Sequence, residues 1–182
     1  VASGAVVRLS GLTLEGGEAF ISYAFTNGGT LRMDQCIVVP AGGTSTVVTG
    51  LLNVGTAVLR DVSIGGGQAK STSNGIENME TGVLEGMNLV VSAPVCDQGS
   101  GTGIRNKGIL ELNQSSVSVG YTGSNGTGIY QISGNVELTG GVVEVANSLG
   151  KSTALFVEGG EAFVVGAILH GGSGINGAAA LR

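Results

Sequence analysis

The chain has 182 residues, of which 42% are apolar and only 12% are charged, so it is too apolar for a disordered protein. Its 35 glycines lack the strict triplet spacing of collagen, and no apolar run approaches the roughly 20 residues of a membrane-spanning helix. The formal net charge of −5 leaves no basic stripe to meet phosphates. We therefore expect no nucleic acid partner and no membrane insertion.

A repeat of about 26 residues runs from one end of the chain to the other. Each unit opens with alternating apolar and polar residues, as at 29–33, 108–112 and 134–138. One apolar position of this segment is interpreted as equivalent in all units, and its residues are Leu9, Met33, Leu59, Leu84, Leu112, Leu138 and Val164. Such a period, made of short strands and glycine turns, is typical of a solenoid. With no linker, residues 1–182 are expected to form a single domain.

Two further short strands are expected in each unit, because the alternation resumes twice. The inward residues of the second strand are predicted to be Leu12 and Leu14, Cys36 and Val38, Val62 and Ile64, Met87 and Leu89, Ser115 and Val117, Gly141 and Val143, and Ala167 and Leu169. After a loop rich in Gly, Ser and Thr, the third strand begins with Gly or Ala, at 50–53, 75–78, 103–106, 128–131 and 154–157. The predicted fold is all-β, a parallel β-helix of about seven coils.

A column of side-chain amides is expected where the third strand ends. Its members are Asn27, Asn53, Asn78, Asn106 and Gln131. An amide at a tight bend can bond to backbone groups that the bend leaves unpaired, and to the amides of neighbouring coils. A ligand-binding stripe is the alternative for these residues, but Val157 replaces the amide in the next unit. We predict a structural ladder.

The repeat unit resembles those of a known fold family. Gly-Ile-x-Asn-x-Gly is followed by x-Leu-x-Leu-x-x, a small residue, x and Val, as in 103–117. This pattern is similar to the right-handed parallel β-helix repeats of bacterial surface and autotransporter-type proteins, an architecture shared with pectin-lyase-like folds. The resemblance implies a right-handed coil and covers essentially the whole chain. It does not specify an activity, because this scaffold carries lyases, hydrolases, adhesins and structural rods.

Catalytic chemistry would have to lie on outward positions, and Glu111 and Glu137 are the candidates. On adjacent coils their carbons would be about 5 Å apart, near the carboxylate separation of a retaining glycosidase. The alternative is a pair of solvated surface carboxylates. Asp34, Arg60 and Glu85 are interpreted as a column of alternating charge on successive coils. The hydrolase segments of pectin-lyase-like enzymes are missing from the sequence, so we expect no enzyme, no cofactor and no metal site.

Several large apolar side chains are expected to face outward near the C-terminal end. They are Tyr130 and Phe156 on the third strand, Phe163 and Val165 on the first, and Ile168 on the second. An exposed apolar surface of this kind indicates a partner, a second copy or a covering loop. Cys36 takes an inward position and Cys96 lies in a long loop two coils further on, so a disulfide between them is not expected.

Three functions are consistent with these features. The leading hypothesis is a non-enzymatic structural rod, located at a cell surface or in an extracellular filament or adhesin, that self-associates through open solenoid ends. A second is a carbohydrate-binding β-helix, such as a tailspike or adhesin segment, that holds glycans along Tyr130 and Phe156. A third is a glycan hydrolase or lyase that uses Glu111 and Glu137.

Overall fold

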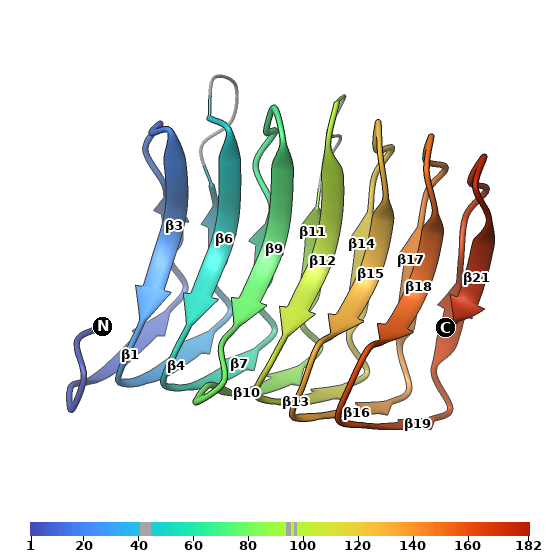
Figure 1. Cartoon of the computed structure of the whole chain (residues 1–182). Helices are drawn as coiled ribbons and strands as arrows, with labels where there is room; N and C mark the ends of the chain where they lie inside the picture. The colour runs from blue at the N-terminus through green and yellow to red at the C-terminus, as the bar shows by residue number, and fades with distance from the viewer. Residues whose placement is uncertain (41–44, 94–95, 97) are drawn as a thin grey trace.

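The computed structural model describes residues 1–40, 45–93, 96 and 98–182. The chain is an all-β, right-handed parallel solenoid with three strands in each coil. Figure 1 shows the coils side by side along one axis, with the two termini at opposite ends. None of the described residues belongs to a helix long and apolar enough to cross a bilayer.

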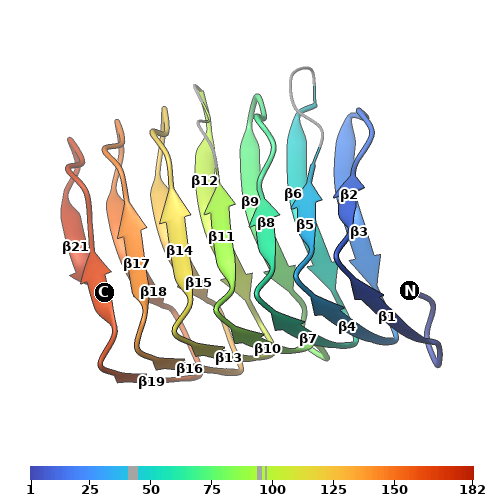
Figure 2. The same cartoon turned by 180° about the vertical axis from the view of Figure 1, so that it is seen from behind.

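The strands form three sheets of seven strands each, and every pairing is between successive coils. The first sheet consists of β1 (Val6–Ser10), β4 (Thr30–Asp34), β7 (Thr56–Arg60), β10 (Val83–Met87), β13 (Ile109–Asn113), β16 (Asn135–Thr139) and β19 (Glu161–Val165). The second consists of β2 (Thr13–Glu15), β5 (Ile37–Val39), β8 (Ser63–Gly65), β11 (Val90–Ala93), β14 (Ser116–Val119), β17 (Val142–Val145) and β20 (Ile168–His170). The third consists of β3 (Ile21–Asn27), β6 (Val47–Asn53), β9 (Thr72–Asn78), β12 (Ser100–Asn106), β15 (Gly126–Gln131), β18 (Ser152–Val157) and β21 (Ala178–Leu181). The second and third sheets face each other and the first closes one side (Figures 1 and 2).

The core is a set of stacked apolar columns between the three sheets. Period-two alternation gives the first-sheet strands of the inner coils one buried face, as in β13, where Leu110 and Leu112 are buried and Glu111 is exposed. The third sheet contributes one such column, made of Phe25, Leu51, Ile76, Ile104, Ile129 and Leu155. Each coil buries its apolar residues against those of the coils on both sides, which is how a solenoid gains stability.

Glycine in the third sheet lets that sheet approach the second closely. A Cβ on Gly103 would lie 2.3 Å from the Val117 side chain and 2.6 Å from the Gly128 carbonyl oxygen. Gly75 meets Val91 in the same way, at 2.3 Å. The glycines that begin four of the five predicted third strands, Gly50, Gly75, Gly103 and Gly128, are therefore a packing requirement.

At the corner between the first and second sheets, one residue in each coil has left-handed backbone geometry. These residues are Gly11, Gln35, Asp61, Asn88, Gln114, Gly140 and Gly166, with φ between 48° and 66°. The amide N–H of each of the first six donates to a carbonyl of the next coil, as Gln114 does to Thr139 at 2.9 Å. All seven coils thus turn this corner in the same way.

The strand register corrects one predicted equivalence. Gly86, and not Leu84, pairs with Leu59 and Leu112, because β10 begins at Val83. The same two-residue shift continues into the second sheet, where Val91 pairs with Ile64 and Val117. Met87 is consequently outward and 47% exposed, although an inward position was predicted.

The two cysteines are buried and neither is in a disulfide. Cys36 is 1% exposed in the core, as predicted from its equivalence to Val62. Cys96 is completely buried near the bend that joins the second and third sheets, and its thiol donates to the Ala69 carbonyl at 3.3 Å. Both act as small buried side chains.

Candidate functional site

The amide ladder is present and buried. The side-chain nitrogen of Asn27 donates to the amide oxygen of Asn53 at 2.8 Å, Asn53 to Asn78 at 2.8 Å, and Asn78 to Asn106 at 2.7 Å. Asn106 then donates to Gln131 at 2.6 Å. These amides are at most 1% exposed, so a ligand has no access to them. The predicted structural ladder is confirmed.

Each ladder amide also satisfies carbonyls of the bend after the third strand. The side-chain nitrogen of Asn78 lies 3.2 Å from the Gly82 carbonyl oxygen and 2.9 Å from that of Ile109 in the next coil. Asn106 makes equivalent contacts to Gly108 and Asn135, both at 3.1 Å. The ladder thereby joins the third sheet of one coil to the first sheet of the next.

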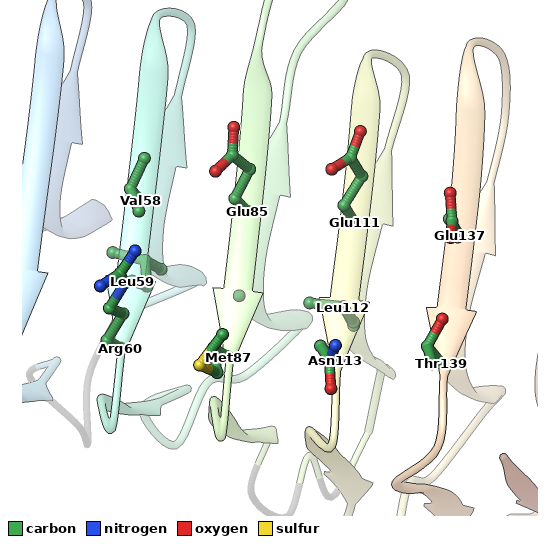
Figure 3. Close-up of a pocket in the computed structure, with 11 residues that line it drawn as sticks. Val58, Leu59, Arg60, Glu85, Met87, Glu111, Leu112, Asn113, Glu137 and Thr139 are labelled. Carbon is green, nitrogen blue, oxygen red and sulfur yellow. The ribbon is translucent and has the colours of Figure 1, made fainter. Parts of the chain in front are cut away.

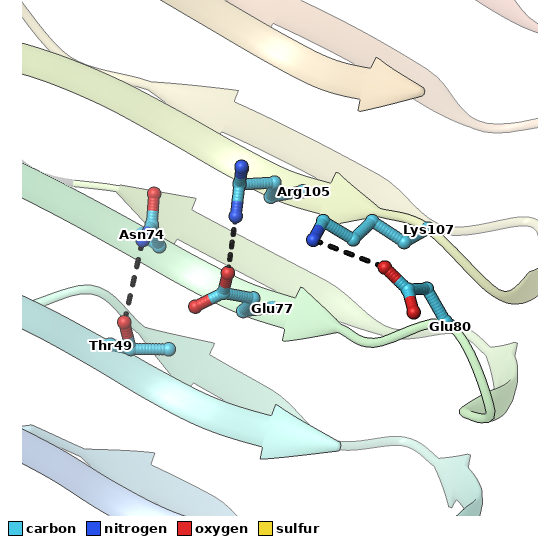
Figure 4. Close-up of polar contacts among 6 residues, drawn as sticks. All are labelled: Thr49, Asn74, Glu77, Glu80, Arg105 and Lys107. Carbon is cyan, nitrogen blue, oxygen red and sulfur yellow. Dashed lines mark hydrogen bonds and ion pairs between the residues drawn. The ribbon is translucent and has the colours of Figure 1, made fainter. Parts of the chain in front are cut away.

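Outside the ladder, further polar contacts join residues of the third sheet and of the turns that follow it. Arg105 on β12 donates to Glu77 on β9 at 2.5 Å, and the two residues are register partners (Figure 4). Lys107 lies 3.4 Å from Glu80 on the adjoining turn, and Asn74 donates to Thr49 at 3.4 Å. These contacts also run between successive coils.

The aromatic pair predicted on the third strand stacks along the rod axis. The rings of Tyr130 and Phe156 are 5.1 Å apart with an interplanar angle of 14°. The guanidinium of Arg182 covers Phe156 at 5.5 Å from the ring centroid. Phe156 therefore has a side chain over each face of its ring. The Tyr130 hydroxyl donates to Glu158, and this hydrogen bond, together with burial, raises the pKa of Tyr130.

A hollow of about 320 Å³ lies beside this pair on the third sheet. Its lining includes Tyr130, Phe156 and Arg182 together with Ser100, Thr102, Asn125, Thr127, Lys151 and Thr153. Hydroxyls, an amide and two cations around ring edges are groups that can hydrogen-bond a polar ligand. The hollow brings together the residues predicted for glycan binding and adds the surrounding polar side chains.

The first sheet carries a column of three glutamates on its outer face. Glu85, Glu111 and Glu137 are register partners on β10, β13 and β16, so their Cα atoms are about 4.8 Å apart. Figure 3 shows them along one face, with Arg60 on the preceding strand. They line a hollow of about 180 Å³ with Met87, Asn113 and Thr139. The predicted proximity of Glu111 and Glu137 is confirmed, whereas their catalytic role stays a prediction.

Glu85 belongs to this column and was missed there. The predicted alternation of Asp34, Arg60 and Glu85 is wrong, since Met87 is the register partner of Arg60. The glycine before each first-sheet strand from β4 to β19, such as Gly55, Gly82 and Gly108, marks the correct register in the sequence.

The other apolar site residues lie away from the aromatic pair. Phe163 and Val165 are outward on β19 of the first sheet, and Ile168 is outward on β20 of the second. They are 63%, 48% and 52% exposed, respectively. Tyr130 and Phe156 belong to the third sheet, so the five residues do not share one face.

Among the described residues, no group of three or more His, Cys, Asp or Glu side chains is arranged to hold a metal ion. Neither the protein-family models nor the curated proteins nor the solved structures include a match to this chain.

Proposed function

We propose that the chain is a non-enzymatic structural rod of a cell-surface or extracellular assembly, such as a filament or an adhesin. The observation that carries the proposal is the direction of its side-chain contacts. The amide ladder, the Glu77–Arg105 ion pair and the Tyr130–Phe156 stack join residues 25 to 28 positions apart, in successive coils. Such contacts stabilise the interfaces between coils, on which the stability of a solenoid depends.

The proposal includes axial self-association. The strands β1 to β3 at one end and β19 to β21 at the other each have one edge without a partner strand in the described chain. Parallel strand edges with free N–H and C=O groups bind further strands. A coil of the same shape can therefore continue all three sheets. The resemblance to β-helix repeats of bacterial surface proteins supports the extracellular location.

Negative-stain electron microscopy at increasing protein concentration, with light scattering alongside, tests this function. We expect rods of uniform width whose length increases with concentration. A species that stays monomeric at every concentration and hydrolyses a polysaccharide would overturn the proposal.

Glycan binding is the second candidate, because the hollow beside Tyr130 and Phe156 is lined by polar groups. Contacts would come from its hydroxyls, Asn125 and Lys151, since the faces of Phe156 are already covered. A glycan array probed with the chain and with Lys151→Ala tests this candidate. We expect hits that the variant loses; an empty array removes the candidate.

A further inference from the structure

The outer face of the first sheet carries its charges in two blocks of opposite sign. The arginine block consists of Arg8, Arg32 and Arg60 on β1, β4 and β7, together with Asp34. The glutamate block consists of Glu85, Glu111, Glu137 and Glu161 on β10, β13, β16 and β19. All eight side chains are exposed. The face is therefore basic at the N-terminal end of the rod and acidic toward the C-terminal end.

Among the described residues, no side chain of either block is in an ion pair. The ion pairs between described residues are Arg105–Glu77 and Lys107–Glu80, on the third sheet and the turn that follows β9. Like charges directly opposite each other on neighbouring strands are destabilising. Arg8 and Arg32 are such a pair, and so are Glu111 and Glu137. Opposite charges brought from outside would relieve both repulsions.

The two blocks also line separate hollows on the same face. A hollow of about 300 Å³ is lined by Arg8, Arg32 and Asp34. The hollow of about 180 Å³ described above is lined by Glu85, Glu111 and Glu137. Both reach Val58 and Arg60, near the boundary between the blocks. The surface thus offers two concave, oppositely charged regions in line along the rod.

We propose that this face binds the same face of a second copy of the chain, with the two rods antiparallel. A partner of one charge sign would match only one block, whereas a second copy supplies both. Rotation about an axis parallel to the strands reverses the order of coils and keeps the strand direction. The contact is then isologous, and each pair of charges occurs twice.

The straight register of the first sheet defines the charge pairs. Strands pair without offset from β1 to β19, so Arg8, Arg32, Val58, Glu85, Glu111 and Glu137 form one column. In the antiparallel pair, Arg8 faces Glu137 of the second copy and Arg32 faces Glu111. Parallel rods in register would instead place arginine against arginine and glutamate against glutamate. Charge therefore selects the antiparallel arrangement.

This contact is lateral and uses no strand edge, so it stands or fails independently of the axial association proposed above. Sedimentation equilibrium of the purified chain provides the first measurement. At protein concentrations below those at which rods lengthen, we expect a species of twice 17.9 kDa at low ionic strength, with a dissociation constant that rises about tenfold or more in high salt. A chain that is monomeric at low salt and high concentration overturns the proposal.

Two charge-reversed proteins provide the decisive test. The first carries Arg8→Glu and Arg32→Glu, and the second carries Glu111→Arg and Glu137→Arg. Each has lost lateral attraction to its own kind, so each is expected to be monomeric at concentrations below those at which rods lengthen. In an equimolar mixture every charge pair is opposite again, and we expect the dimer to return.

Lys70→Glu with Lys151→Glu is the matched control for the first of these proteins, because it makes the same change in net charge at exposed positions off the first sheet. This control is expected to dimerise like the unchanged chain. Circular dichroism verifies that all variants are folded. If the folded charge-reversed variants form dimers on their own at these concentrations, or form none when mixed, the lateral contact is refuted. Rods that still lengthen with concentration would then leave the axial proposal intact.

Discussion

The third and first sheets contain the same number of strands, yet they use their polar side chains in opposite ways. On the third sheet, the amides of the ladder and the Glu77–Arg105 pair bond to the next coil. On the first sheet, Arg8, Arg32 and the three glutamates face outward, outside both ion pairs of the described chain. The polar side chains of the third sheet thus hold the coils together, whereas those of the first lie exposed on the surface.

Loss of the close packing between the second and third sheets should lower the free energy of unfolding most. In Gly103→Ala, the new Cβ lies 2.3 Å from Val117 and 2.6 Å from the Gly128 carbonyl oxygen. We expect the free energy of unfolding to fall by about 3 kcal/mol, measured by urea denaturation. Gly17→Ala is the control, since nothing lies within 4 Å of a Cβ there. Equal stability of the two variants would show that the glycine is not required for packing.

A break in the amide ladder should lower the free energy of unfolding somewhat less. Asn78→Ala removes the donor to Asn106 and leaves the Gly82 and Ile109 carbonyls without that partner. A loss of about 2 kcal/mol in thermal or urea unfolding is expected. Asn113→Ala changes the same residue type on the exposed face of the first sheet and should be nearly neutral. Similar losses for the two variants would contradict a structural role for the ladder.

A matched pair of arginines compares the two sheets directly. Arg105→Ala breaks the partly buried ion pair with Glu77 and should lower stability by about 0.5 kcal/mol. Arg32→Ala, on the first sheet, should leave the unfolding transition unchanged and weaken self-association. Urea unfolding and sedimentation are measured for both. A stability loss in Arg32→Ala together with unchanged association would reverse the roles assigned to the two sheets.

The smallest effect is expected at the corner between the sheets. Gln114 has φ of 48°, a region in which glycine is not strained. Gln114→Gly should therefore raise the free energy of unfolding, measured by urea denaturation, by about 0.5 kcal/mol after the greater entropy of the unfolded glycine is included. Gln131→Gly, at a ladder position with ordinary geometry, should destabilise the chain. Destabilisation by both substitutions would show that the corner does not favour glycine.

Much of this fold was predictable, because its sequence pattern is local and recurs in every coil. The alternation of apolar and polar residues predicted the strands. The side-chain amides that recur at Asn53, Asn78 and Asn106 predicted the ladder, because the bend after the third strand places equivalent side chains one coil apart. The equivalence of the fourth coil was wrong because Gly86 holds a position that leucine occupies in β7 and β13. A glycine contributes nothing to an apolar pattern, so Leu84 was assigned in its place.

The corner and the charge blocks were harder to predict from sequence. The corner residues include Gln35, Asp61 and Gly140, and what they share is a backbone angle rather than a side-chain type. The glutamate column depends on the register between β10 and β13, in which Glu85 pairs with Glu111. The predicted register of β10 was wrong by two residues and placed Glu85 in the column of Arg60. The separation of positive and negative charge along the first sheet was therefore not visible in the sequence.

The amide ladder also gives the rod an electrical direction. In each described step from Asn27 to Gln131, the nitrogen donates toward the C-terminal coil and the oxygen accepts from the N-terminal side. Aligned amide dipoles add, and hydrogen bonds in such a chain polarise one another. At its end, Gln131 donates to the Ser133 carbonyl at 2.6 Å, and Val157 follows in the next coil. The two ends of the ladder therefore differ in electrostatic potential. In an antiparallel pair of rods, the ladder dipole of one rod would cancel that of the other.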